Sequence, residues 1–166
     1  GTQWYDAGAL PSNSNSVTIT SLAVPREQEV RYNVEQYYNR VNERVDYSVV
    51  SSPVAAIRAA YPGNYSVLQI AEAFTWIREN IEYVNEGTED YWKTAQETLS
   101  SREGDCEDHA ILLCSIIGAL GGNARVNLIE ARAFPTVFVA STYADLLKVR
   151  ASLASYYGLD ASVFRM

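Results

Sequence analysis

The chain has 166 residues, of which 48% are hydrophobic and 20% are charged, and its formal net charge is −7. This length predicts one domain, and the composition is typical of a globular protein and excludes extended disorder. The thirteen Lys and Arg residues are scattered along the chain. Without a basic stripe we expect neither nucleic acid nor an anionic membrane surface as a partner.

The N-terminal segment, residues 1–24, is rich in Ser, Asn, Thr and Gly and predicts an irregular arm with a short strand at Val17–Leu22. Residues 25–166 carry the periodic patterns and predict one domain. The sequence starts with Gly1 rather than Met, and the arm has the composition of a linker. We therefore expect an extracytoplasmic domain, tethered to a membrane through a segment upstream of this sequence.

Four segments before residue 101 predict helices. Pro25 and Pro53 suit helix starts, and Ser66 and Thr94 suit N-cap positions. The helices are expected at 26–46, 53–60, 67–80 and 95–100. The third helix carries an apolar stripe formed by Leu68, Ile70, Ala71, Phe74 and Ile77. A short strand is expected at Ile81–Val84, between the third and the fourth helix.

The most apolar segment of the chain, Ala110–Leu120, predicts a helix that is buried on all sides. This segment is well short of the ~20 apolar residues that a membrane span needs. Asp105 suits the N-cap position, and Asp108 three residues later forms a pair with it that resembles a capping box. Gly121 and Gly122 are expected to end the helix.

The last third of the chain changes to strands. Asn123–Glu130 and Ala133–Ala140 are β-branched segments with a period of two, and they predict an antiparallel hairpin. Thr142–Tyr157 predicts a closing helix that Gly158 ends. The order of the elements predicts an α+β fold, in which a central buried helix packs against a small antiparallel sheet and extra helices precede it.

Cys106 falls in the first turn of the central helix, where free N–H groups and the helix dipole favour a thiolate and can stabilise an oxyanion. This position suits a nucleophile. Four acidic residues nearby oppose it, because carboxylates that face the sulfur raise a thiol pKa. They are Glu103, Asp105, Glu107 and Asp108. The alternative is a buried helical cysteine with no chemical role.

The remaining cysteine and the single histidine are less informative. Cys114 lies two turns deeper in the apolar segment and is expected in the core. A helix would separate the Cα atoms of Cys106 and Cys114 by ~12 Å, too far for a disulfide. His109, the only histidine, excludes a multi-histidine metal site. It is expected to be partly exposed near Asp105 or Asp108, and we expect no metal site.

Three segments carry a resemblance to a known family: Tyr91–Leu99, Gly104–Leu113 with its Gly-Asp-Cys-Glu-Asp core, and Leu120–Val126 with its Leu-Gly-Gly start. Together they resemble the transglutaminase-like superfamily in its archaeal and bacterial branch, over about residues 55–140. The resemblance implies a papain-like cysteine proteinase fold and acyl transfer on protein or peptide substrates without a cofactor. It also implies that Cys106 is the nucleophile, and that Trp92 and the Cys106 backbone form the oxyanion site.

The resemblance fails at the histidine of the family's Cys-His-Asp triad, because Arg132 stands at that position. Arginine keeps its proton at neutral pH and cannot serve as a general base. The triad's acid is also unmatched: the candidates are Asp145 and Asp160, and otherwise the acid lies beyond Met166 or is absent. The departure predicts a degenerate, catalytically impaired domain that binds protein or peptide segments. The alternative is an active cysteine acyl-transferase or peptidase that uses Cys106.

Overall fold

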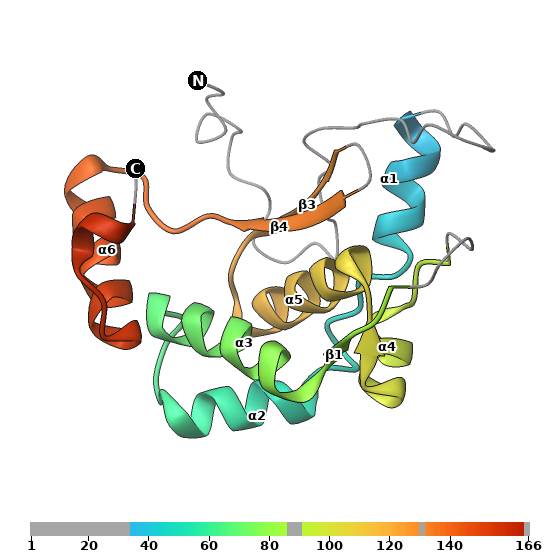
Figure 1. Cartoon of the computed structure of the whole chain (residues 1–166), viewed down its shortest axis with the longest axis horizontal. Helices are drawn as coiled ribbons and strands as arrows, with labels where there is room; N and C mark the ends of the chain where they lie inside the picture. Colours follow the sequence, from blue (N-terminus) through green and yellow to red (C-terminus); the bar gives the residue numbers. More distant parts are fainter. Residues whose placement is uncertain (1–33, 86–90, 130–131, 165–166) are drawn as a thin grey trace.

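The computed structural model describes residues 34–85, 91–129 and 132–164 (Figure 1). The expected arm, its strand at Val17–Leu22 and the first part of the helix at 26–46 lie outside these residues. The α-helices are α1 Val34–Asn42, α2 Ser51–Ala60, α3 Val67–Asn80, α4 Ala95–Ser101, α5 Cys106–Leu120 and α6 Tyr143–Tyr157. The strands are β1 Glu82–Tyr83, β2 Glu103–Gly104, β3 Ala124–Ile129 and β4 Arg132–Val137, and a short 3-10 helix, η2 Ala161–Val163, follows α6.

Helix α5 lies in the middle of the molecule, with the β3–β4 hairpin on one side and α2, α3 and α4 around the other (Figure 1). Every residue of 110–117 is buried, as the continuous apolar segment predicts. Each fully buried Ile or Leu contributes about 1.5–3 kcal/mol of transfer free energy, so this helix is the main source of the core. Gly121 ends it with a φ of +100°, a conformation that favours glycine. The expected α+β arrangement is confirmed.

The hairpin places Ala133 of β4 beside Cys106, at the start of α5. Its antiparallel register pairs Ala124 with Val137 at one end and Ile129 with Arg132 at the other. Ala133 is buried and faces α5, whereas Arg132 and Phe134 are exposed on either side of it. This alternation follows from the period of two in a strand. The start of β4 is therefore the part of the sheet that lies next to Cys106.

A second, very short sheet joins two segments that are distant in sequence. Strands β1 and β2 pair in parallel, with Glu82 opposite Glu103 and Tyr83 opposite Gly104. The pair is extended by the Val84 N–H, which donates to the Gly104 carbonyl at 3.0 Å. It fastens the end of α3 to the start of α5, and so brings Tyr83 to the beginning of the central helix.

Two helices differ from the sequence expectation. α1 ends at Asn42 rather than at residue 46, because the chain turns there and buries Val45 from a loop. On α3, Phe74 is 46% exposed although the apolar stripe includes it, while Gln69 is buried and its Nε2 donates to the Tyr61 carbonyl at 2.8 Å. An amide whose NH2 group is hydrogen-bonded can stand in a core in place of an apolar side chain, and periodicity does not reveal that.

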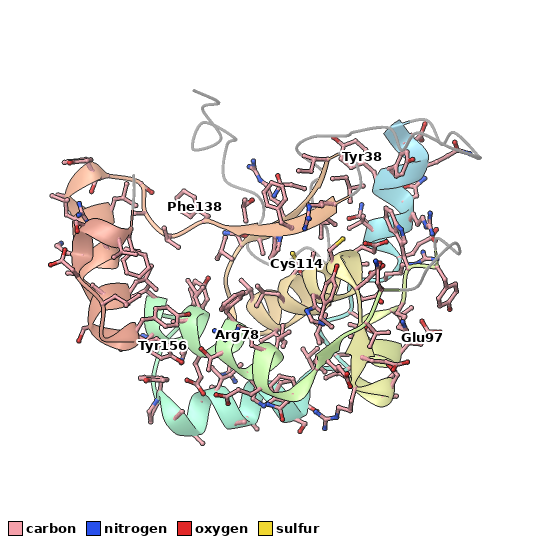
Figure 2. All side chains as sticks on the ribbon, in the orientation of Figure 1. Tyr38, Arg78, Glu97, Cys114, Phe138 and Tyr156 are labelled. Carbon is pink, nitrogen blue, oxygen red and sulfur yellow. The ribbon has the colours of Figure 1, made fainter. Side chains whose placement is uncertain are left out.

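The closing helix α6 has the predicted ends: the Thr142 side chain accepts from the Asp145 N–H, and Gly158 ends the helix in the left-handed conformation. It packs mainly on α3, where the Tyr156 hydroxyl donates to Glu72 at 2.7 Å. Figure 2 shows Tyr156 between these two helices. In Figure 1, α6 lies at the edge of the molecule, beyond the hairpin and far from the start of α5.

Replacing Gly122 with alanine is expected to lower the free energy of unfolding by about 1–3 kcal/mol, the usual cost of overpacking. A Cβ on Gly122 would lie 2.2 Å from the Tyr65 ring, whereas nothing lies within 4 Å of the corresponding atom on Gly121. Urea denaturation measures the change. If the clash is the cause, the same substitution in a Tyr65→Ala background costs much less; an equal cost in both backgrounds would contradict it.

Candidate functional site

Three elements meet at Cys106, the first residue of α5. Its side chain is half-buried, and its thiol donates to Oε2 of Glu107 at 3.0 Å. From β4, the backbone N–H of Ala133 donates to the sulfur at 3.2 Å. β1 contributes Tyr83, whose hydroxyl is close enough for the Cys106 charge to raise its pKa. The predicted position at a helix start and beside a strand is therefore confirmed.

The protonation state of Cys106 follows from these contacts. Burial, the hydrogen bond to Glu107 and the charges of Glu107 and Asp105 together raise the pKa of the thiol to about 11. The Ala133 N–H lowers the pKa, because it stabilises the thiolate. The raising effects prevail, so Cys106 is a neutral thiol at neutral pH. The helix start does not compensate, as an N-terminal dipole is worth only about 0.3–1 kcal/mol.

Arg132 begins β4, next to the residue that contacts the sulfur. Its side chain is exposed. Burial and the charges of Cys106, Asp105 and Glu107 raise the pKa of the Tyr83 hydroxyl, whereas the positive charge of Arg132 lowers it. Tyr83 therefore lies within electrostatic reach of these four groups. At the place where the resemblance implies a histidine, the structure has a permanent cation that cannot accept a proton.

The one histidine of the chain lies on α5 beside this group. His109 is half-buried, and its ring meets the ring of Tyr83 edge-on, with 5.6 Å between the centroids. Burial lowers its pKa, so the imidazole is neutral at neutral pH. The sequence predicts the strand at Ile81–Val84 that contains Tyr83. It does not predict the pairing of that strand with Glu103–Gly104, and this pairing brings Tyr83 to the site.

A buried carboxylate supports the start of α5. Asp108 is fully buried; its Oδ1 accepts from the Lys93 backbone N–H at 2.7 Å, and its Oδ2 accepts from Lys93 Nζ and the Asp105 N–H, both at 3.3 Å. The bond from Asp105 confirms that part of the expected capping box. The bonds from Lys93 were not predicted. Asp108 thus holds the segment that precedes α4 against the turn that presents Cys106.

Trp92 lies in that same segment and is buried, with 5% of its surface exposed. Its ring lies 6.0 Å from the Tyr37 ring and 4.1 Å from the Arg40 guanidinium, and its carbonyl accepts from Arg44 Nε at 2.7 Å. These contacts place its indole against α1. A role for Trp92 at an oxyanion site remains a prediction from the family resemblance.

The two candidate triad acids lie elsewhere. Asp145 is exposed on α6 and bonds to Thr142 and to Lys148, with 2.8 Å to the Lys148 Nζ. Asp160 caps η2 by accepting from the Ser162 N–H. These bonds are local to the C-terminal helices, so the structure does not bring either carboxylate together with Cys106.

Cys106 and Cys114 are both free, as expected. Cys114 is buried within α5 in the middle of the molecule (Figure 2), and burial raises its pKa strongly. In the part of the chain that the structure describes, no group of three His, Cys, Asp or Glu side chains is arranged to hold a metal ion. None of the described helices is both long and apolar enough to cross a membrane.

Comparison with known proteins gives one family and one solved structure. The family model described as transglutaminase-like superfamily matches residues 54–135. No curated protein matches the chain. A crystal structure from Cytophaga hutchinsonii, described as a "Putative Cysteine Protease", is 19% identical with a TM-score of 0.47. The similarity covers 60% of this chain and 36% of that one, so the chain spans about a third of that protein's length.

Proposed function

Residues 54–135 belong to the transglutaminase-like superfamily, and from this premise we propose that the domain is a catalytically impaired member that binds protein or peptide segments beside Cys106. The observation that carries the proposal is the contact between the thiol of Cys106 and the carboxylate of Glu107, at 3.0 Å. A cysteine enzyme needs a base at the sulfur. Here the sulfur contacts the carboxylate of Glu107, which leaves the thiol protonated. The residue at the start of β4 is Arg132 rather than a histidine.

The protonated thiol is a large kinetic handicap. With a pKa of about 11, only about one molecule in ten thousand carries a thiolate at pH 7. Arg132 can attract a thiolate or a carboxylate but cannot return a proton to a leaving amine. His109 sits on the same helix as Cys106 with its ring against Tyr83, rather than on the strand that faces the sulfur.

The surroundings of Cys106 suit the binding of an extended segment. Tyr83, from β1, is 56% exposed, and Val84 next to it is exposed as well. Large exposed apolar side chains are frequent where proteins bind peptides, because aromatic anchors supply most of the binding energy. Arg132, whose charge acts on the Tyr83 hydroxyl, adds a cation that would favour an acidic group in the bound segment.

The alternative function is an active cysteine acyl-transferase or peptidase with Cys106 as the nucleophile. One observation favours it: the Ala133 N–H donates to the sulfur at 3.2 Å, which would stabilise a thiolate once it formed. In that case the proton must leave through a group that the bound substrate supplies, since Arg132 cannot take it.

Turnover assays separate the two functions. We expect neither cleavage of casein, nor ammonia release from glutamine-containing peptides, nor incorporation of a primary amine above the rate of the Cys106→Ala variant. Any turnover that Cys106→Ala abolishes would refute the hypothesis of a catalytically impaired domain and establish the alternative.

Binding is tested on an array of immobilised peptides with the same protein. Wild type and Cys106→Ala are expected to bind the same peptides, while Tyr83→Ala binds them at least about fivefold more weakly, as loss of one aromatic anchor costs about 1–2 kcal/mol. Phe74→Ala is the matched control, because Phe74 is also an exposed aromatic residue but lies on α3. Equal losses in both variants, or no binding by wild type, would contradict the peptide-binding part of the proposal.

A further inference from the structure

The residue after Cys106 is oriented in an unusual way for a helix. Neighbouring residues on a helix usually point in different directions. The Glu107 carboxylate nevertheless turns back to Cys106 and accepts a hydrogen bond of 3.0 Å from its thiol. Glu107 is half-buried. The contact is therefore a specific side-chain pair in the first turn of α5, at the site of the expected nucleophile.

This contact can exist in one protonation state of the thiol only. The thiol donates, and the ionised carboxylate accepts. Loss of the thiol proton would break the bond and leave two negative groups about 3 Å apart, which is unfavourable in a partly buried place. Carboxylates are in general much weaker bases than alkyl thiolates, so the proton of this hydrogen bond stays on the sulfur.

We propose that Glu107 holds Cys106 in its neutral thiol form and so suppresses its reactivity. Glu107 is a positioning residue rather than a catalytic one, since it acts on the sulfur and on no substrate. The inference rests on the proposed function, an impaired domain, and it names one cause of the impairment. The low reactivity of Cys106 depends on the Glu107 carboxylate as well as on the missing histidine.

The other charged groups around the sulfur do not explain the suppression equally well. Asp105 acts in the same direction but only through its charge. The carboxylate of Asp108 is bonded to Lys93. On the facing elements, Arg132 from β4 is a cation, which in general favours a thiolate, and Tyr83 from β1 is neutral at neutral pH. His109, on α5 itself, is neutral as well. Glu107 is thus the only carboxylate in this set with a hydrogen bond to the sulfur.

The test is alkylation of the Glu107→Gln variant by iodoacetamide across a range of pH. In this reaction the thiolate displaces iodide, a carbon–sulfur bond forms, and the thiol proton passes to the buffer. Glutamine keeps the size of the side chain, removes the negative charge and can donate to the sulfur. We expect the midpoint of the pH profile to fall by about one pH unit and the neutral-pH rate to rise about threefold, since the extra thiolate is partly offset by its lower nucleophilicity.

Glu103→Gln is the matched control, because it makes the same charge change three residues before Cys106 on an exposed side chain of β2. Its pH profile is expected to coincide with that of wild type. Cys106→Ser gives the background, which should be negligible because Cys114 is buried. Circular dichroism confirms that each variant is folded, and Glu107→Asp, whose shorter carboxylate reaches the sulfur less well, is expected to lie between wild type and Glu107→Gln.

An unchanged midpoint in folded Glu107→Gln, or an equal shift in Glu103→Gln, would overturn the inference. Failure of the proposed function has a different signature, namely amide turnover by the wild-type protein that Cys106→Ala removes. The alkylation profile and the turnover assay are independent measurements, so each proposal can fail without the other.

Discussion

Replacing Asp108 with asparagine is expected to lower the free energy of unfolding by about 2–4 kcal/mol, the usual cost of breaking a buried ion pair. The wild-type carboxylate is fully buried and accepts three hydrogen bonds, two of them from Lys93. Asparagine would turn an amide NH2 toward one of these donors and would remove the negative charge beside the Lys93 ammonium, whose side chain is only 15% exposed. Chemical denaturation in urea measures the loss.

Asp145→Asn is the matched control for Asp108→Asn. Both residues occupy the third position of a 15-residue helix, bond to their N-cap residue and pair with a lysine. Asp145 is exposed, and exposed ion pairs contribute little. We expect a much smaller change at Asp145. Equal effects at the two positions would mean that the capping role, and not the buried pair with Lys93, accounts for the stability at Asp108.

The second large effect is the slow alkylation of wild-type Cys106. With a pKa of about 11, its reaction with iodoacetamide near neutral pH is expected to be at least about twentyfold slower than that of an unstructured cysteine, whose pKa is about 8.5. The rate is expected to keep rising about tenfold per pH unit through pH 10, because the folded thiol deprotonates only near its raised pKa. A rate measured at intervals from pH 7 to pH 10 provides the profile.

The comparison peptide for this experiment has the sequence of residues 101–110, which cannot form the core contacts that bury the sulfur. Its alkylation rate should level off near pH 9, while that of the folded protein continues to rise. Mass spectrometry should locate the label at Cys106, with Cys114 unmodified until the protein is denatured. If the alkylation rate of folded Cys106 levels off at the same pH as that of the peptide, the raised pKa is contradicted, and with it the hypothesis of a catalytically impaired domain.

The central helix and its ends were predictable because their causes are local. Continuous apolar residues from Ala110 onward require burial on every side, Asp105 satisfies the free N–H groups at a helix start, and Gly121 adopts a positive φ that other residues avoid. The same holds for the capping of α3 by Ser66 and of α4 by Thr94. In each case the physical reason acts within a few residues.

The site could be predicted only in part. Cys106 at a helix start beside β4 was expected, and the acidic neighbours were expected to raise its pKa if they faced the sulfur. Sequence could not say which of them does so, because that depends on the side-chain conformation: Glu107 turns to the sulfur, whereas Asp108 turns to Lys93. The contribution of Tyr83 depends on a two-residue strand pair that joins residues about twenty apart in the chain.

The amino-acid order by itself determined the α+β layering, the central buried helix, the hairpin and the location of the Cys106 thiol, since periodicity, caps and turns are properties of neighbouring residues. Tertiary structure alone decided the state of that thiol. Burial under β4 and the donor from Ala133 depend on the packing of distant segments, and the acceptor on Glu107 depends on the conformation of its side chain. A thiol pKa responds to its surroundings in three dimensions, so the same Gly-Asp-Cys-Glu-Asp segment can hold a reactive or an unreactive cysteine.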